Sequence, residues 1–246
     1  MTGLWRSPSG QVFVSDFQSK MFWARDSSTP AAPWASADLP ARMEGVFGLS
    51  DQEVYAFGRQ GGAAHFFRFD GASWNPLPAP PLPVIALHGI APDLLFAVGD
   101  EGMLARWDGA KWSRLDTGSR RVLSRVFVVS ADEVYATGHG RELFVASVYG
   151  AQRALEHTHP LHGVAKWGER VWVLAGGDLG LSVFENGALV SIKPKLKGTW
   201  IEAGESLLVT TPEMVASTSN GVDFKAKTVQ GLKNALEASG PPLWRR

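Results

Sequence analysis

Three histidines stand close together in the segment "HTHPLHG" at 157–163. His157 and His159 are two positions apart, so their side chains share one face if the segment is extended. Imidazole nitrogens are common ligands of Zn²⁺, and His162 follows three residues later. Glu156 is adjacent but points the other way on an extended strand, and no other fourth ligand is evident. We therefore expect no bound cofactor and keep zinc at these three histidines as the alternative to ordinary surface side chains.

The composition restricts the partners of the chain. Lys and Arg together number 24, as do Asp and Glu, so the formal net charge is zero and offers no basic field for nucleic acid. There is no cysteine, so disulfides and thiolate metal sites are excluded. The first residues lack a basic segment followed by an apolar one, and no apolar run is long enough to span a membrane. We expect a cytoplasmic protein that binds neither nucleic acid nor membrane.

Sequence motifs for catalysis are sparse. No Walker loop and no dinucleotide-binding loop is present, and the glycine-rich stretches "GRQGG" and "GDLGLS" are typical of turns. A non-catalytic role is therefore the expectation for this chain.

The elements that position these residues repeat along the chain. Short apolar and aromatic runs recur, each with one large residue that we call the anchor, and the anchors are Phe13, Tyr55, Phe96, Tyr135, Trp172 and Leu208. They are spaced by 42, 41, 39, 37 and 36 residues. Each run is short, rich in Val, Phe, Trp and Tyr, and ends near Gly, which favours strands over a helical repeat.

Each repeat predicts four antiparallel strands, which is the composition of a propeller blade. In the second and third copies, Asp70-Gly71 and Asp108-Gly109 predict a type I′ hairpin turn between the two outer strands. The sequence thus predicts one all-β domain over residues 1–246, a six-bladed β-propeller. The expected blades cover about 3–42, 43–84, 85–121, 122–160, 161–196 and 197–229, followed by a tail at 230–246.

The tail leaves an alternative open. The segment "ALEASGPPLWRR" can be aligned with the first two strands of a repeat, which puts Trp244 at the anchor position, 36 residues after Leu208. That alignment predicts an incomplete seventh blade, whereas the simpler interpretation is a short helix and an end segment.

The alternation of strand direction places two sets of connections on one face of the ring. This face would present charged and polar side chains to a partner, because loops commonly carry function. The expected partner-binding residues are Arg59, Arg120, Arg121, His139, Arg141, Glu142, His157 and His159. The matching words "LHGIA" and "LHGVA" put His88 and His162 at the start of inner strands, and we expect them at the mouth of the central channel.

The repeat "V-G-x-S-x-x-x-V-Y-A-x-G … F-D-G-x-x-W" resembles the divergent bacterial propeller repeats of the WD/YVTN and kelch/BNR-like kind. The segment "STSNGVDF" at 217–224 resembles a degenerate Asp box, with Ser219 in place of Asp and Phe224 in place of Trp. Proteins with such repeats include sialidases, photosystem assembly factors, lectins and scaffolds, so the resemblance implies architecture rather than activity.

The residues favour some of these functions over others. A sialidase would use a Tyr nucleophile, but Tyr55 and Tyr135 are anchors and only Tyr149 is left. Propeller hydrolases hold a Ca²⁺ ion in the channel with oxygen ligands. The residues expected at the starts of the inner strands supply few such ligands, since they are Glu44, His88, Arg125, His162 and Lys197. A lectin would use repeated tryptophans, and the candidates are Trp23, Trp34, Trp74, Trp107 and Trp112.

We therefore expect a non-catalytic module that binds a partner protein through one loop face, such as a bacterial adaptor, assembly factor or toxin-neutralising immunity protein. A carbohydrate-binding propeller lectin, and a hydrolase or lyase with a site at the channel mouth, are the alternatives.

Overall fold

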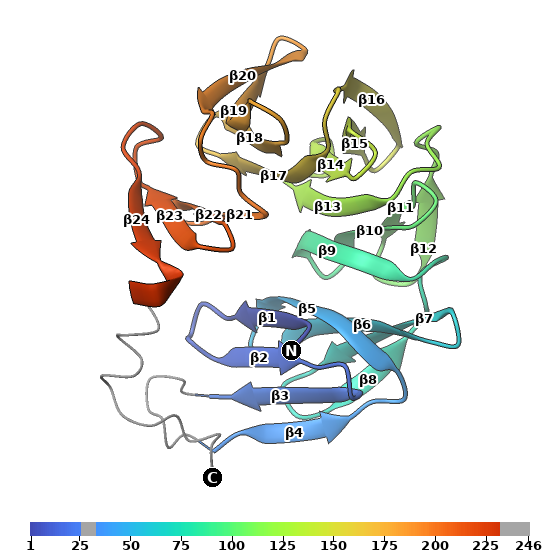
Figure 1. The fold of residues 1–246 in the computed structure, drawn as a ribbon. Helices are drawn as coiled ribbons and strands as arrows, with labels where there is room; N and C mark the ends of the chain where they lie inside the picture. Colours follow the sequence, from blue (N-terminus) through green and yellow to red (C-terminus); the bar gives the residue numbers. More distant parts are fainter. Residues whose placement is uncertain (26–32, 232–246) are drawn as a thin grey trace.

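The computed structural model describes residues 1–25 and 33–231, and these residues form six four-stranded antiparallel sheets arranged in a ring (Figure 1). The predicted six-bladed β-propeller is confirmed. The half-repeat around Trp244 and most of the "DSSTPAAP" segment that replaces the hairpin turn of the first copy lie outside the described residues.

Each blade is one continuous stretch of chain, with its strands paired in sequence order. Blade 1 contains β1 (Gly3–Arg6), β2 (Val12–Ser15), β3 (Lys20–Ala24) and β4 (Ala35–Asp38). Blade 2 contains β5 (Arg42–Ser50), β6 (Glu53–Gln60), β7 (Ala63–Phe69) and β8 (Trp74–Leu77). Blade 3 contains β9 (Val84–Ala91), β10 (Leu94–Gly99), β11 (Leu104–Trp107) and β12 (Trp112–Leu115).

The second half of the chain repeats this arrangement. Blade 4 contains β13 (Leu123–Val128), β14 (Val134–Gly138), β15 (Glu142–Ser147) and β16 (Gly150–Glu156). Blade 5 contains β17 (Leu161–Trp167), β18 (Arg170–Ala175), β19 (Gly180–Glu185) and β20 (Ala188–Lys193). Blade 6 contains β21 (Trp200–Ala203), β22 (Leu207–Thr210), β23 (Met214–Thr218) and β24 (Lys225–Thr228).

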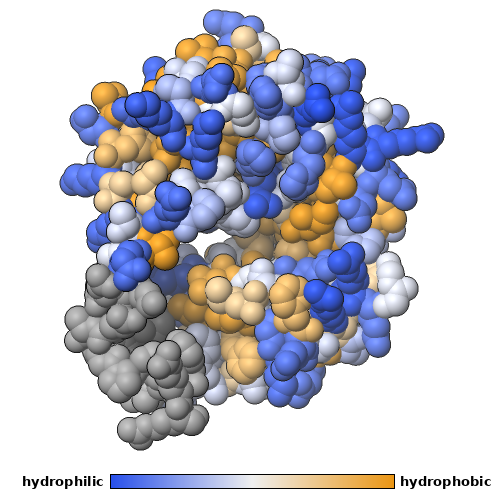
Figure 2. Space-filling view, in the orientation of Figure 1, coloured by the Kyte–Doolittle hydropathy of each residue, from blue (hydrophilic) through white to orange (hydrophobic). Residues whose placement is uncertain are grey.

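The first strand of every blade is the innermost one and borders the centre of the ring (Figure 1). Successive inner strands contact each other from β1 through β5, β9, β13 and β17 to β21. The space-filling view shows an opening at the centre of the ring, bordered by pale and apolar side chains (Figure 2). The inner strands therefore form the wall of a central channel.

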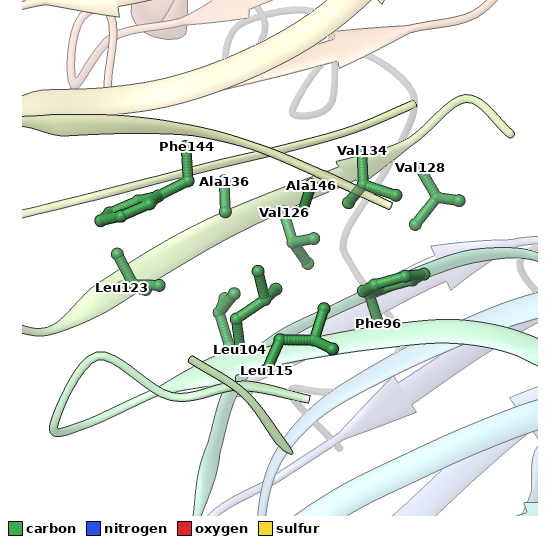
Figure 3. Close-up of a cluster of buried hydrophobic side chains, with 11 residues drawn as sticks. Phe96, Leu104, Leu115, Leu123, Val126, Val128, Val134, Ala136, Phe144 and Ala146 are labelled. Carbon is green, nitrogen blue, oxygen red and sulfur yellow. The ribbon is translucent and has the colours of Figure 1, made fainter. Parts of the chain in front are cut away.

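Five of the six anchors are buried between their own blade and the next. Phe13 packs against blade 2, and Tyr55, Phe96, Tyr135 and Trp172 pack in the same way against blades 3 to 6. Figure 3 shows Phe96 of β10 in the cluster that joins blades 3 and 4. Burial of one such side chain contributes roughly 1.5–3 kcal/mol, so each of these anchors stabilises the packing of its blade against the next.

The sixth anchor differs because it has no next blade in sequence. Leu208 lies on the face of β22 turned away from blade 5, since its neighbours Leu207 and Val209 pack into the cluster with that blade. Leu208 is 38% exposed, and Leu4 of β1 is 58% exposed. Among the described residues, no apolar cluster joins blade 6 to blade 1. We call this junction the seam.

The hairpin turns differ from the type I′ prediction. Gly71 and Gly109 have positive φ, but Asp70 and Asp108 do not, so the two-residue geometry is wrong for these copies. Instead, the Asp70 carboxylate accepts hydrogen bonds from the backbone N–H groups of Ala72 and Ser73, both at 2.9 Å. Asp108 does the same for the third copy. Aspartate therefore closes a four-residue loop by capping its backbone donors.

Candidate functional site

One face of the ring carries the connections between blades and those between the second and third strands of each blade. The first set comprises residues 39–41, 78–83, 116–122, 157–160 and 194–199. The second set comprises residues 16–19, 61–62, 100–103, 139–141, 176–179 and 211–213. We call this side the loop face, and the expected partner-binding residues lie on it or at strand ends next to it.

The histidine segment lies on the loop face between blades 4 and 5. The ring centroids of His157 and His159 are 5.8 Å apart, and His157 Nδ1 accepts a hydrogen bond from the backbone N–H of His159 at 3.1 Å. His162 lies at the start of β17 and faces a different set of neighbours, described below. Within residues 1–25 and 33–231, no group of three or more His, Asp or Glu side chains has the arrangement of a metal site.

A network of charged side chains ties the connections of blade 4 together. Glu142 is buried, and its two carboxylate oxygens accept hydrogen bonds from Arg153 Nη1 at 3.0 Å and Ser119 Oγ at 2.7 Å. Arg121 donates to the carbonyl oxygen of Gly140 at 2.7 Å and to Glu156 at 3.1 Å. The structure therefore gives Glu142 and Arg121 partners within the chain, and their role in binding another protein stays a prediction.

The loop-face edge of blades 1 and 2 is hollowed. A wide depression of about 670 Å³ is lined by Ser19, Leu39, Pro40, Ala41, Arg42, Arg59, Gln60, Gly61 and Gly62. Arg59 Nε forms an ion pair with Glu44 at 2.7 Å. The Arg42 guanidinium lies 4.3 Å from the ring centroid of Phe17, whose side chain is 55% exposed. An exposed aromatic ring beside a polar depression is a favourable contact point for another chain.

Three other predicted residues of the loop face are exposed. Arg120 precedes β13, and His139 and Arg141 connect β14 to β15. Neither arginine has a carboxylate within ion-pair distance in the described part of the chain. Their charges are therefore available to an acidic surface.

His88 lies deeper in the channel wall than the sequence predicted. It is in the middle of β9, and its ring lies 5.2 Å from Phe47 and 4.6 Å from Phe127 between ring centroids. Its Nδ1 accepts a hydrogen bond from the backbone N–H of Val128 at 3.0 Å, which links blades 3 and 4. Burial lowers the pKa of His88 to about 4, so the ring is neutral at pH 7. The structure gives His88 a packing role between blades.

The channel mouth on the loop face is dominated by a residue to which the sequence had assigned no binding role. Arg125, near the start of β13, reaches past blade 5, and its guanidinium carbon lies 4.4 Å from the ring centroid of Trp200 in blade 6. Arg125 Nη1 donates a hydrogen bond to the carbonyl oxygen of Ser124 at 2.6 Å. Its Nη2 donates to the carbonyl oxygen of Thr199 at the longer distance of 3.5 Å. Its Nε–H is buried and has no hydrogen-bond partner.

Strand register places mostly small residues at the level of Arg125. Arg125 pairs with Thr137, which lies two residues after the anchor Tyr135. The inner-strand residues that pair with the corresponding position of each blade are Gly3, Gly45, Ala86, Arg125, Gly163 and Trp200. Four of these residues have at most a methyl side chain. Gly163 belongs to blade 5, between the blades of Arg125 and Trp200, and an added Cβ there would meet Ile201 at 2.8 Å and Leu174 at 3.2 Å.

His162 lies near this arginine. Burial lowers the pKa of His162, and the charges of His139 and Arg125 lower it further. Burial also lowers the pKa of Arg125, which nevertheless stays charged at neutral pH. The mouth thus combines one arginine charge with an imidazole whose pKa is lowered and with an indole ring. The indole N–H of Trp200 donates to Glu202 at 3.0 Å.

The tryptophans considered for a sugar site serve mainly to pack the blades. Trp23 and Trp74 contact Phe69, and Trp107 and Trp112 contact Phe66, with ring centroids 5.1–5.9 Å apart. The indole N–H groups of Trp107 and Trp112 donate to backbone carbonyl oxygens at 3.1 Å. Trp34 is 50% exposed beside β4.

The fold and the register define a repeat-built six-bladed β-propeller, and comparison with solved structures supports that class. The chain is similar to virginiamycin B lyase from Staphylococcus aureus, with a TM-score of 0.72 and 14% identity over 93% of this chain and 84% of the lyase. It is also similar to YCF48 bound to D1 peptide, with a TM-score of 0.64 and 13% identity over 92% of this chain and 78% of that one.

A third similar structure is YCF48 from Cyanidioschyzon merolae, with a TM-score of 0.63 and 12% identity over 92% of this chain and 84% of that one. Identities this low show a shared fold and leave function to be argued from the site. No protein-family model and no curated protein sequence matches the chain. Within the described residues, no helix has the length and apolar character needed to cross a bilayer.

Proposed function

We propose that this propeller is a non-catalytic module that binds a partner polypeptide on its loop face. The observation that carries the proposal is the set of cationic side chains on this face that have no carboxylate partner among the described residues. These are Arg42 at the depression, Arg120 and Arg141 at blade 4, and Arg125 at the channel mouth. Arginines beside exposed aromatic rings are enriched in protein interfaces.

The comparisons are consistent with this proposal. One similar structure is a propeller with a bound peptide, and another is a lyase, so the fold accommodates both kinds of function. An adaptor, an assembly factor and a toxin-neutralising immunity protein would each use such a face. The cytoplasmic location expected from the sequence stays a prediction.

A face-specific crosslinking experiment tests the proposal. A photoreactive amino acid is placed at Arg141 on the loop face and, as the matched control, at Tyr149, which is 88% exposed in a turn on the opposite face. In the native host, we expect a covalent protein adduct of defined mass from position 141 and none from position 149. Charge reversal by Arg120→Glu should lower the adduct yield at position 141. No adduct, or equal adducts from both faces, would contradict the proposal.

A further inference from the structure

We propose that Arg125, Trp200 and His162 form a carboxylate-binding site at the channel mouth, and that its ligand is a carboxylate of the partner polypeptide. This inference rests on the proposed function, because it names the chemical group by which the partner is held. The site is distinct from the predicted rim residues and from the histidine segment at 157–159.

The hydrogen bonds of Arg125 are incomplete. A guanidinium has five N–H donors, and the structure gives Arg125 two protein acceptors, both of them neutral carbonyl oxygens. The Nε–H is buried without an acceptor. No carboxylate of the described residues lies within 4.0 Å of this guanidinium. Burying a cation without an anion is unfavourable, so an anion that enters the mouth would be stabilised there.

The surroundings hold the guanidinium in place for a ligand. It lies over the Trp200 ring at 4.4 Å, which fixes its plane while leaving donors unused. The nearest acid along β21, Glu202, accepts the indole N–H of Trp200 at 3.0 Å and forms no ion pair with Arg125. The residues at the same level of the channel in three other blades, Gly45, Ala86 and Gly163, have at most a methyl side chain and carry no charge that could pair with the arginine.

The charge of the mouth matches a monoanion. Arg125 supplies one positive charge, and burial and the neighbouring charges lower the pKa of His162, which disfavours a second positive charge there. A carboxylate carries one negative charge and matches the planar fork of arginine with two parallel hydrogen bonds.

Titration with small probes tests the site directly. The probes are acetyl-Ala-Ala-Leu with a free C-terminal carboxylate, the same peptide as its C-terminal amide, acetyl-Ala-Asp-Ala-amide, and inorganic phosphate. The readouts are the NMR resonances of Arg125 Nε–H and Trp200 Nε1–H, the latter assigned with Trp200→Phe. We expect saturable shifts with a carboxylate peptide, and none with acetyl-Ala-Ala-Leu-amide. Saturation by the first or the third peptide identifies a terminal or a side-chain carboxylate as the source.

Variants separate the site from the surface around it. Arg125→Gln should weaken peptide binding about tenfold or more, because hydrogen bonds to charged groups are the strong ones. Arg125→Lys keeps the charge but loses the fork, and we expect an intermediate affinity. Lys111→Gln, in the exposed 108–111 hairpin on the opposite face, removes one charge outside the proposed binding surface and should bind like the wild type. Unchanged thermal unfolding of each variant establishes that the fold is intact.

The outcomes distinguish this inference from the proposed function. Tighter binding of phosphate than of any carboxylate, or equal binding by wild type and Arg125→Gln, overturns the carboxylate site. If position 141 still crosslinks to a partner in the Arg125→Gln protein with unchanged yield, the loop face binds but Arg125 is not its anchor. Saturable carboxylate binding without any crosslinked partner would instead support the site and contradict the proposed function.

Discussion

At the residue scale, the two histidines in matching sequence words have different environments. His88 lies between two phenylalanine rings in the channel wall, whereas His162 lies at the mouth near Arg125. The sequence could place both residues on inner strands from the repeat alone. It could not predict their depth, because depth depends on how the neighbouring blades pack around each ring.

The neutral state of His88 predicts a pH-dependent stability. Its pKa in the folded protein is about 4, below its usual value of 6.5, so the unfolded chain binds more protons between these values. The free energy of unfolding therefore falls as the pH is lowered from about 6.5 toward 4. Between pH 7 and pH 5 the His88 contribution should fall by about 2 kcal/mol.

His88→Gln isolates this contribution, because glutamine offers an acceptor for the Val128 N–H and does not titrate. Urea unfolding of both proteins at pH 7 and pH 5 measures it. Lowering the pH from 7 to 5 should reduce the unfolding free energy of the wild type by about 2 kcal/mol more than that of the variant. Parallel pH profiles would show that His88 is accessible to protons in the folded state.

Arg125 shows what the sequence could not reveal at this scale. It was evident as a charged residue near the start of an inner strand, but only strand register shows that the equivalent positions are mostly Gly or Ala. The contact with Trp200 joins residues of blades 4 and 6, which no local pattern predicts.

At the element scale, hairpins with similar sequences, an Asp or Asn followed by Gly, have two different turn geometries. Asp70 and Asp108 cap four-residue loops, whereas Asn186-Gly187 forms a tight two-residue turn with φ of 52° and 79°. Sequence reasoning located the turns at Asp70-Gly71 and Asp108-Gly109 correctly from their Asp-Gly pairs. It assigned the wrong geometry to the Asp-Gly copies, because aspartate can also bind the backbone N–H groups that follow it.

A matched pair of glycine variants tests the conformational origin of the tight turn. Neither Gly187 nor Gly150 has any atom within 4 Å of an added Cβ, but only Gly187 has positive φ. We expect Gly187→Ala to lower the free energy of unfolding by about 1–2 kcal/mol through backbone strain alone. Gly150→Ala should cause no loss of stability. Chemical denaturation measures both, and equal effects would contradict this explanation.

At the scale of the whole molecule, the anchors report how the ring is held together. Their spacing was sufficient to predict six blades, because each repeat has one large residue in the same register, and five of the six bury it against the next blade. Leu208 occupies the same register yet is 38% exposed, since the junction from blade 6 to blade 1 lacks an apolar cluster among the described residues. The sequence shows Leu208 as the one non-aromatic anchor of the six, but its exposure depends on the packing of blade 6 against blade 1, which no local pattern predicts.

The seam predicts unequal protection of the blades. Blades 1 and 6 pack through apolar clusters on one side, whereas blades 3 and 4 do so on both. We expect backbone amides of β2 and β22 to exchange with deuterium faster than those of β10 and β14, because regions with fewer buried contacts open at lower free energy. Hydrogen-exchange mass spectrometry measures this order. Equal or slower exchange in the two blades at the seam would show that it is firmly closed in solution.

The continuity of each blade has a mechanical consequence. No described strand is shared between distant parts of the chain, so tension applied between blades 1 and 6 meets no interlocked strand that must break first. Such a pull would remove blades from the ends of the row inward, and each blade of about 40 residues would lengthen the chain by roughly 130 Å. Under load the ring would behave as a row of six units released one after another.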